Sequence, residues 1–283
     1  MRLFCFSMVS TLLKFYRLLS ILSLDVAVGA VCSSVWFADF FGVKPGGIAF
    51  TVLGLTVWII YTLDHLVDAR TIKSPANAKR YQFHQQHFSI IGIVWMLAIV
   101  CDGVLVFFMR KEILYDGLWL SALVIIYFLF HRYVGFLKEF TIAVLYTVGV
   151  LLPTLSLKGA PPIASEWAVI SSFLLTALIN ILLFSWVDHD ADVSDGQHSF
   201  AIVFGRRHTQ KFVNILFIAQ VILQFVIIYW GGAAPVILLL SMNSVLLFIF
   251  YYAERLKKND SFRLAGDAVF FFPAVALFLR WIF

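Results

Sequence analysis

Long apolar stretches separated by short polar ones run along the whole chain. Each is long enough, at about twenty residues, to cross the hydrocarbon core of a bilayer as a helix. Loop residues such as Pro161-Pro162 and Gly231-Gly232 mark some of the breaks. The pattern predicts an all-α, polytopic membrane protein with about nine transmembrane helices in one bundle around a central cavity. The predicted spans are 18–41, 46–67, 88–109, 113–131, 134–156, 167–187, 209–230, 233–253 and 264–283.

Composition agrees with this pattern. Of the 283 residues 62% are hydrophobic and 13% are charged, whereas soluble domains are about half apolar and a quarter charged. We therefore expect residues 1–283 to form a single transmembrane domain with a short cytoplasmic N-terminal segment, 1–16. No cleavable signal peptide is expected, and the three separated cysteines, Cys5, Cys32 and Cys101, indicate neither a disulfide framework nor a zinc site.

The distribution of Lys and Arg predicts the orientation in the membrane. With the N-terminus inside, the cytoplasmic side holds 16 of the 21 Lys and Arg residues and the outside only 5, which is the bias of cytoplasmic loops. The C-terminus is then outside, and loops 68–87 and 188–208 share the cytoplasmic side. We expect a bacterial-type inner membrane, and the +5 net charge reflects topology, so no nucleic-acid partner is expected. The cytoplasmic cations are Arg2, Lys14, Arg17, Arg70, Lys73, Lys79, Arg80, Arg132, Lys138, Arg206, Arg207, Lys211, Arg255, Lys257, Lys258 and Arg263.

Two pairs of aspartates end predicted spans on that side. Asp64 and Asp68 end the second span, and Asp188 and Asp192 end the sixth. Residues four apart share a helix face, so each pair presents two carboxylates together, and a hard cation would relieve their repulsion. Mg²⁺ takes one or two carboxylates and completes its shell with water and phosphate oxygens. The four aspartates therefore predict a Mg²⁺ site for a diphosphate, although solvated acids at a membrane edge are the plainer alternative.

Basic loops follow both pairs and could close over a diphosphate, since Arg suits phosphate oxygens. Many of these cations could equally be ordinary anchors of the positive-inside kind. Asn180 continues the face of Asp188 and Asp192 inward, Asp190 is expected to point away, and Asp195 to orient the basic loop. From these loops and this face we predict diphosphate contacts by Arg70, Lys79, Arg80, Asn180, Asp195 and His198.

Two further acids lie in apolar segments. Asp25 has no partner nearby in the sequence, so it is expected to line the cavity. Asp267 follows Arg263 by four residues, and this spacing predicts a local ion pair.

The stretch VDHDADVSDGQHSFAIVFG resembles the second aspartate-rich segment of the UbiA superfamily of intramembrane prenyltransferases. That segment has D-x-x-x-D, then Gly, a basic residue with Ser or Thr, and an apolar run ending in Gly. The matching residues here are Asp188, Asp192, Gly196, His198-Ser199 and Gly205. The first family motif, N-x-x-x-D-x-x-x-D, is similar to Ile60-x-x-x-Asp64-x-x-x-Asp68, and LKEFT at 137–141 is similar to a segment that supplies Lys138.

The chain departs from the family at several of these positions. Ile60 replaces the motif asparagine, Tyr61 an acid that often follows it, and Glu139 an arginine. His198 replaces a lysine, and AsnAlaLysArg at 77–80 stands where the family usually has Asn-Arg-Pro. The metal-binding acids are kept while several groups that orient the substrate are not, so the departures bear on the acceptor more than on the diphosphate.

The resemblance implies a Mg²⁺-dependent transfer of a prenyl group from a polyprenyl diphosphate to a hydrophobic acceptor, such as an aromatic, quinone or lipid precursor. The donor's hydrocarbon would lie in an apolar tunnel among membrane lipid, and Asp64, Asp68, Asp188 and Asp192 would bind Mg²⁺ as the catalytic acids, with Lys138 at the diphosphate. A terpene cyclase on the same scaffold and a non-catalytic relative that binds prenyl lipid are the alternatives. A CDP-alcohol phosphotransferase is rejected because the two acid pairs are too far apart in sequence, and a transporter is disfavoured because the acids sit at one face.

Overall fold

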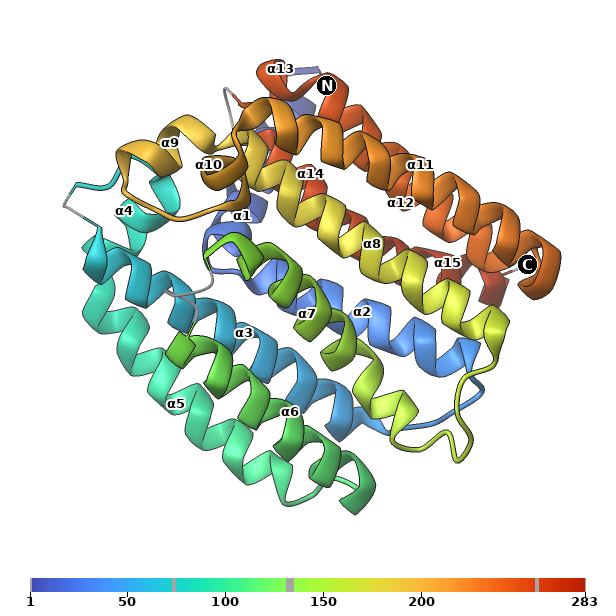
Figure 1. Cartoon of the computed structure of the whole chain (residues 1–283). Coiled ribbons are helices and arrows are strands. Elements are labelled where there is room, and N and C mark those ends of the chain that lie inside the picture. The colour runs from blue at the N-terminus through green and yellow to red at the C-terminus, as the bar shows by residue number, and fades with distance from the viewer. Residues whose placement is uncertain (1, 73–74, 131–134, 258–259, 283) are drawn as a thin grey trace.

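The computed structural model describes residues 2–72, 75–130, 135–257 and 260–282, and every regular element in these ranges is a helix (Figure 1). The all-α prediction is therefore confirmed. The elements are α1 (Arg2–Ile21), α2 (Leu24–Phe40), α3 (Gly47–Thr71), α4 (Lys79–Gln86), α5 (Phe88–Val106), α6 (Lys111–Phe130), η1 (Gly135–Leu137), α7 (Lys138–Leu155), α8 (Ala164–Val187), α9 (His189–Ser194), α10 (Phe200–Phe204), α11 (Arg206–Gly231), α12 (Ala233–Tyr251), α13 (Ala253–Lys257), α14 (Ser261–Ala268), η2 (Val269–Phe271) and α15 (Phe272–Ile282).

In these ranges, eight helical segments are long and apolar enough to cross a membrane: α3, α5, α6, α7, α8, α11, α12 and the continuous stretch Ser261–Ile282. The bent pair α1–α2 makes a ninth if it counts as one span. Each corresponds to one predicted stretch, so the chain is a multi-pass membrane protein. Three cations used in the topology prediction, Lys73, Arg132 and Lys258, lie outside the described residues.

The first predicted span, 18–41, is broken rather than straight. The axes of Thr11–Ile21 and Leu24–Phe40 differ by 84°. Ser23, at the break, adopts the left-handed conformation with φ 57°, which is uncommon for a residue other than glycine. The indole Nε1 of Trp58 donates a 2.8 Å hydrogen bond to the carbonyl of Leu22, which satisfies a backbone group that the break frees. The expected short segment 1–16 accordingly belongs to a helix, because α1 begins at Arg2.

Helix α8 forms the centre of the bundle. Leu182 and Leu183 are completely buried, and α7, α11 and α12 all pack against this helix. Polar side chains join these helices inside the apolar core, since the Gln220 amide accepts from Ser172 Oγ at 2.7 Å and donates to Thr176 Oγ1 at 2.9 Å. Such interhelical hydrogen bonds fix helices against one another where lipid supplies no hydrophobic drive.

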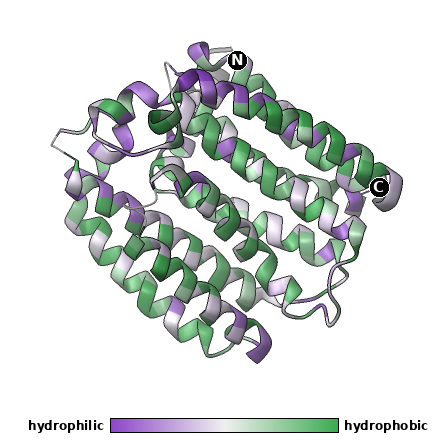
Figure 2. Ribbon diagram, in the orientation of Figure 1, coloured by the Kyte–Doolittle hydropathy of each residue, from purple (hydrophilic) through white to green (hydrophobic). Residues whose placement is uncertain are grey.

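The outer helices are apolar on the surface, while polar residues gather at the ends. In α5 and α6 only 6% of the most apolar stretch is buried within the protein, and Figure 2 shows both helices predominantly hydrophobic. These surfaces suit contact with lipid. The short helices α4, α9, α10 and α13 cluster at one end of the bundle (Figure 1), where much of the chain is hydrophilic (Figure 2). The predicted loops 68–87 and 188–208 meet at this end, because Asn77 is hydrogen-bonded to Asp195.

Candidate functional site

A polar cavity of about 170 Å³ opens among α3, α4, α7, α8 and α14 at the hydrophilic end of the bundle. Two carboxylates of the predicted metal set line it, Asp64 and Asp192. Three cations, Arg80, Lys138 and Arg263, line it as well. Acids and cations from separate helices therefore meet in one cavity.

On α3 the predicted first pair has one member in the cavity wall and one behind it. Asp64 lines the cavity, whereas Asp68, one turn later, is 8% exposed and interacts with Tyr81, itself a lining residue. The Oδ2 atom of Asp68 has no hydrogen-bond partner among the described residues. Lys138 at the start of α7 interacts electrostatically with both carboxylates. A cation from another helix therefore balances this pair, and one buried oxygen of Asp68 has no partner among the described residues.

The second pair straddles a helix break. Helix α8 ends at Val187 and α9 starts at His189, but the amide of Asp192 still donates to the carbonyl of Asp188 at 2.9 Å, so the one-turn spacing is kept. Asp192 lines the cavity, while the Asp188 carboxylate is ion-paired with Arg263. Burial raises the pKa of Asp192 to about 6, with Arg263 opposing and Asp188 adding to the rise. Arg263 thus faces both acids of the pair.

The predicted diphosphate contacts divide into two groups. Arg80, Lys138, Asn180 and His198 line the cavity. Asp195 reaches the loop before α4 instead, and Arg70 and Lys79 do not line the cavity.

The positions of Arg70 and Lys79 have simple physical reasons. Arg70 follows Asp68 by two residues, which turns it about 200° around α3, and it is exposed. Lys79 points outward with a side chain 69% exposed and pairs with Asp260 at 3.1 Å. The neighbouring Arg80 turns inward, where its Nη1 donates to Nε2 of His65 at 3.1 Å. Because a guanidinium can only donate, that histidine nitrogen is the acceptor.

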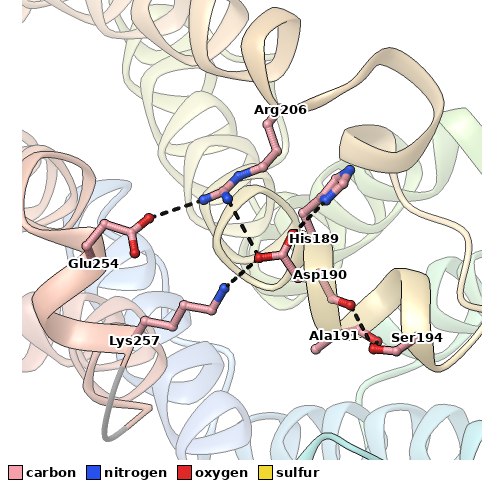
Figure 3. Close-up of polar contacts among 7 residues, drawn as sticks. All are labelled: His189, Asp190, Ala191, Ser194, Arg206, Glu254 and Lys257. Carbon is pink, nitrogen blue, oxygen red and sulfur yellow. Dashed lines mark hydrogen bonds and ion pairs between the residues drawn. The ribbon is translucent and has the colours of Figure 1, made fainter.

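Asp190 lies on the outer side of α9, as helical geometry predicts. Its carboxylate is 64% exposed and pairs with Lys257 at 3.2 Å, Arg206 at 3.7 Å and His189 at 3.3 Å (Figure 3). The hydrogen bond from His189 and the contact with Lys257 hold the pKa of Asp190 below its usual value. Arg206 also reaches Glu254 at 3.3 Å. These contacts fasten α9 to the start of α11 and to the end of α13 from outside the cavity.

Asp195 fastens the two basic loops together. Its Oδ1 accepts from the Asn77 backbone N–H at 3.0 Å and from Asn77 Nδ2 at 2.8 Å, and its Oδ2 accepts from the Ala78 N–H at 3.3 Å. Ala78 is the residue before α4. These contacts fix the segment just before Arg80, as expected if Asp195 orients the basic loop.

Glu139, which departs from the family pattern, has a structural partner. It is 3% exposed, and its Oε1 accepts a 2.6 Å hydrogen bond from the backbone N–H of Phe200, the first residue of α10. Ser185 accepts from the next amide, that of Ala201, at 3.1 Å. The first backbone amides of a helix have no partner within it, so these side chains anchor α10 to α7 and α8.

A second, apolar cavity of about 380 Å³ adjoins the polar one. It lies among α3, α5, α6 and α7 and is lined mostly by aliphatic and aromatic side chains. Tyr61, Ile142 and Tyr146 line both cavities. These three residues form a neck where a charged compartment meets a hydrocarbon-like one.

Sequence reasoning missed several lining residues. His65 could have been noticed because it lies between Asp64 and Asp68. The predicted local ion pair between Arg263 and Asp267 is wrong: Arg263 pairs with Asp188, while Asp267 accepts a 3.4 Å hydrogen bond from Asn180 Nδ2. Asp25 is 2% exposed and does not line the polar cavity directly.

The oxygen donors of the cavity suit a Mg²⁺ ion that is also bound by a phosphate ligand. They do not suit an ion held by protein ligands alone. Within the described ranges no three His, Cys, Asp or Glu side chains converge as a ready metal site. Mg²⁺ in phosphate sites needs only one or two carboxylates and takes its remaining ligands from water and the phosphate. Asp64, Asp192 and the unpartnered Oδ2 of Asp68 provide such hard oxygens.

No protein-family model, curated protein or solved structure matches the chain.

Proposed function

We propose that this protein transfers a prenyl group from a polyprenyl diphosphate to a hydrophobic acceptor within the membrane, with Mg²⁺ as cofactor. One observation carries the proposal: a polar cavity lined by three cations and by several acids, Asp64 and Asp192 among them, joins an apolar cavity through Tyr61, Ile142 and Tyr146. An amphiphile with a diphosphate head and a hydrocarbon tail matches both compartments at once. Aromatic, quinone or lipid precursors are the acceptors that would reach this site from the membrane.

The cations of the polar cavity would hold the diphosphate. Arg80 and Lys138 lie on its wall, and Arg263 would exchange part of its contact with Asp188 for phosphate oxygens. Bound Mg²⁺ would supply positive charge that stabilises the departing diphosphate. Asp64, Asp68 and Asp192 would hold that ion. Asp188 would first keep Arg263 aligned, and it would become the fourth Mg²⁺ ligand when Arg263 turns to the substrate.

The neck would hold the reacting carbon. With the head group among the cations and the tail in the 380 Å³ cavity, the first carbons of the chain lie between Tyr61 and Tyr146. The negative faces of aromatic rings stabilise a nearby cation. Such rings suit a reaction in which the carbon–oxygen bond breaks and leaves allylic positive charge.

We also propose an orientation of the protein in the membrane. The 16-to-5 excess of Lys and Arg would place the polar cavity and the N-terminus at the cytoplasm and the C-terminus outside. Prenyl diphosphates are water-facing at the head group, so a cytoplasmic opening would admit them. A bacterial-type inner membrane would suit this arrangement.

The test uses purified protein in detergent with Mg²⁺ and radiolabelled prenyl diphosphates of several lengths, with and without a panel of quinone precursors. We expect diphosphate release together with a prenylated acceptor, lost in Asp192→Asn and kept in the outward-facing Asp190→Asn. A cyclic hydrocarbon formed without acceptor would identify a terpene cyclase instead. Binding without turnover under every condition would identify a prenyl-lipid binding protein, and equal loss of activity in both variants would contradict the assigned site.

A further inference from the structure

A second pair of acids lies beside the polar cavity, apart from the proposed metal ligands. Asp267 on α14 lines the polar cavity, and Asp25, in the first turn of α2, lies behind it with 2% of its surface exposed. Helix α14 packs against α2, and the contacts on either side of the two acids, Tyr16 with the Leu264 carbonyl and Gly29 with Phe270, bring Asp267 alongside Asp25. They come from helices more than two hundred residues apart in the chain, so the fold and not the local sequence brings them together.

Tight helix contacts fix this pair in place. A Cβ atom added to Gly266 would lie 2.4 Å from Asn180 Oδ1, so α14 touches α8 through a bare backbone. A Cβ added to Gly29 would lie 2.8 Å from Phe270 Cβ, so η2 touches α2 in the same way. The segment that carries Asp267 is thus wedged between Asn180 on one side and the helix of Asp25 on the other.

Asp25 is buried, Asp267 is half-buried in the cavity wall, and the hydrogen-bonding capacity of both is only partly satisfied. Asp267 Oδ1 accepts from Asn180 at 3.4 Å, and Asp25 Oδ1 accepts from the Val26 N–H at 2.9 Å. Two buried oxygens, Asp25 Oδ2 and Asn180 Oδ1, have no hydrogen-bond partner among the described residues. Asn180 is 4% exposed. Arg263, the nearest cation along the chain, is ion-paired with Asp188. Two neighbouring carboxyl groups, neither of them in an ion pair among the described residues, favour one shared proton where one of them is buried.

The groups that surround the pair favour a single negative charge. Two cations act on Asp267, whereas the remaining neighbours are phenols that stay neutral at ordinary pH. Asp25 also interacts with the hydroxyl of Ser20. The titratable groups facing the pair are Tyr16 from α1, Tyr61 from α3, Arg80 from α4, Tyr146 from α7 and Arg263 from α14.

We propose that Asp25 and Asp267 share one proton and that their single negative charge makes Asp267 the base that receives the proton lost by the acceptor. This role rests on the proposed prenyl transfer. In that reaction the donor's carbon–oxygen bond breaks with its electron pair leaving on the diphosphate. The acceptor's nucleophilic atom bonds to the allylic carbon, and the proton released from that atom passes to the Asp267 carboxylate.

The position of Asp267 supports this role over the other acids of the cavity. Asp267 lines the polar cavity together with Tyr61 and Tyr146, the aromatic residues of the neck where the reacting carbon would lie. Asp64 is balanced by Lys138, and Asp192 faces Arg263. Asp267 therefore combines access to the neck with a carboxylate that forms no ion pair among the described residues, because Arg263 is paired with Asp188.

Infrared spectroscopy of the purified protein at neutral pH tests the shared proton. We expect Asp25→Asn and Asp267→Asn each to remove the carbonyl absorption of one protonated carboxyl group, because the acid left alone ionises. The double substitution should remove no more than either single one. Asp116→Asn, an exposed acid on α6 bonded to Ser156, should leave the band unchanged. Additive losses, or no loss in either single variant, would overturn the shared proton.

Isotope exchange separates the base from the site that ionises the donor. Scrambling of ¹⁸O from the bridging position of the prenyl diphosphate reports bond cleavage, and prenylated acceptor reports transfer. Asp267→Asn should lower transfer roughly 100-fold while scrambling persists, and Asp192→Asn should stop both. Equal loss of scrambling and transfer in Asp267→Asn would overturn the accepting role. If the wild type shows neither scrambling nor transfer, the proposed function is refuted. The infrared measurement would still show whether Asp25 and Asp267 share a proton.

Discussion

Arg263 on α14 forms an ion pair with Asp188 at the end of α8, although 75 residues separate them in the chain. The guanidinium also lies over the ring of Phe184 at 4.9 Å. The contact joins the C-terminal helix of the site to the second aspartate pair. It also takes the cation away from Asp267, its neighbour at four residues, and so creates the conditions for the buried acid pair.

The Arg263–Asp188 pair should therefore stabilise the fold. The two side chains are 26% and 18% exposed, so removing one partner leaves a largely buried charge. We expect Asp188→Asn to lower the free energy of unfolding by about 1–3 kcal/mol. Asp188→Asn combined with Arg263→Gln should cost less than the sum of the single changes, as measured by thermal unfolding in detergent.

The exposed pair Lys79–Asp260 is the matched control. Its side chains are 69% and 51% exposed, and such pairs contribute at most about 1 kcal/mol. The Arg263 and Asp188 substitutions could instead lower stability additively and by no more than those at Lys79 and Asp260. This result would show that the buried contact does not couple the helices.

Ionisation of Asp192 should set an acid limit on activity. Burial raises its pKa to about 6, and only the carboxylate binds Mg²⁺ well, so Mg²⁺-dependent diphosphate release should decline as the pH falls through about 6. Stability should change in the opposite direction. The folded state holds this proton more tightly than the unfolded chain, whose Asp pKa is about 4, so stability without Mg²⁺ falls as the pH rises from about 4 to 6.

Thermal unfolding of wild type, Asp192→Asn and Asp190→Asn from about pH 5 to 7 shows whether stability falls as the pH rises. Asp192→Asn should reduce this dependence of stability on pH. Asp190→Asn should leave it, because the pKa of Asp190 is lowered by His189 and Lys257 and this group titrates below that window. An unchanged slope in Asp192→Asn would refute the raised pKa.

The Asp195 contacts should hold the loop before α4. Asp195→Ala removes three acceptor contacts to Asn77 and Ala78, and each hydrogen bond to a charged group is worth about 1.5–3 kcal/mol at most. We expect faster tryptic cleavage after Lys79 and Arg80 and a higher KM for the prenyl diphosphate. Asp190→Ala, whose partners lie on α9, α11 and α13, should not change cleavage at these two sites. Equal cleavage rates in wild type and Asp195→Ala would exclude the orienting role.

Gly266 should resist even the smallest side chain. An added Cβ would meet Asn180 Oδ1 at 2.4 Å and the Phe184 ring at 2.7 Å, so Gly266→Ala forces α14 away from α8 and moves Asp267. We expect a loss of about 1–3 kcal/mol in stability. Gly92→Ala on α5 is the control: nothing lies within 4 Å of its added Cβ, and alanine favours a helix by up to about 1 kcal/mol. A tolerated Gly266→Ala would contradict the close helix contact.

Sequence reasoning located the elements well because each membrane span must be about twenty apolar residues long. Spacing on one helix brought Asp64 and Asp192 into the predicted set, but it equally brought in Asp68 and Asp188, which do not line the cavity, because spacing alone does not show which acid of a pair faces inward. The break at Ser23 escaped it, since neither glycine nor proline marks that turn. The partner of Arg263 escaped it for a different reason: spacing compares residues of one helix, whereas packing of α14 against α8 decides which acid this side chain reaches.

The apolar cavity should set the length of the prenyl chain. Gly117 on α6 lines it, and a Cβ added there meets nothing within 4 Å. Gly117→Phe should therefore place a ring in the cavity and exclude long tails, while the polar cavity stays intact. We expect KM to rise at least tenfold for long prenyl diphosphates, about 1.4 kcal/mol of lost binding, and to change little for the shortest. Gly103→Phe on the exposed surface of α5 adds the same ring outside the cavity, again with no atom within 4 Å of the added Cβ. Similar KM values for all donor lengths in the two variants would show that the tail lies elsewhere, because Gly117, unlike Gly103, lines the compartment that continues from the neck.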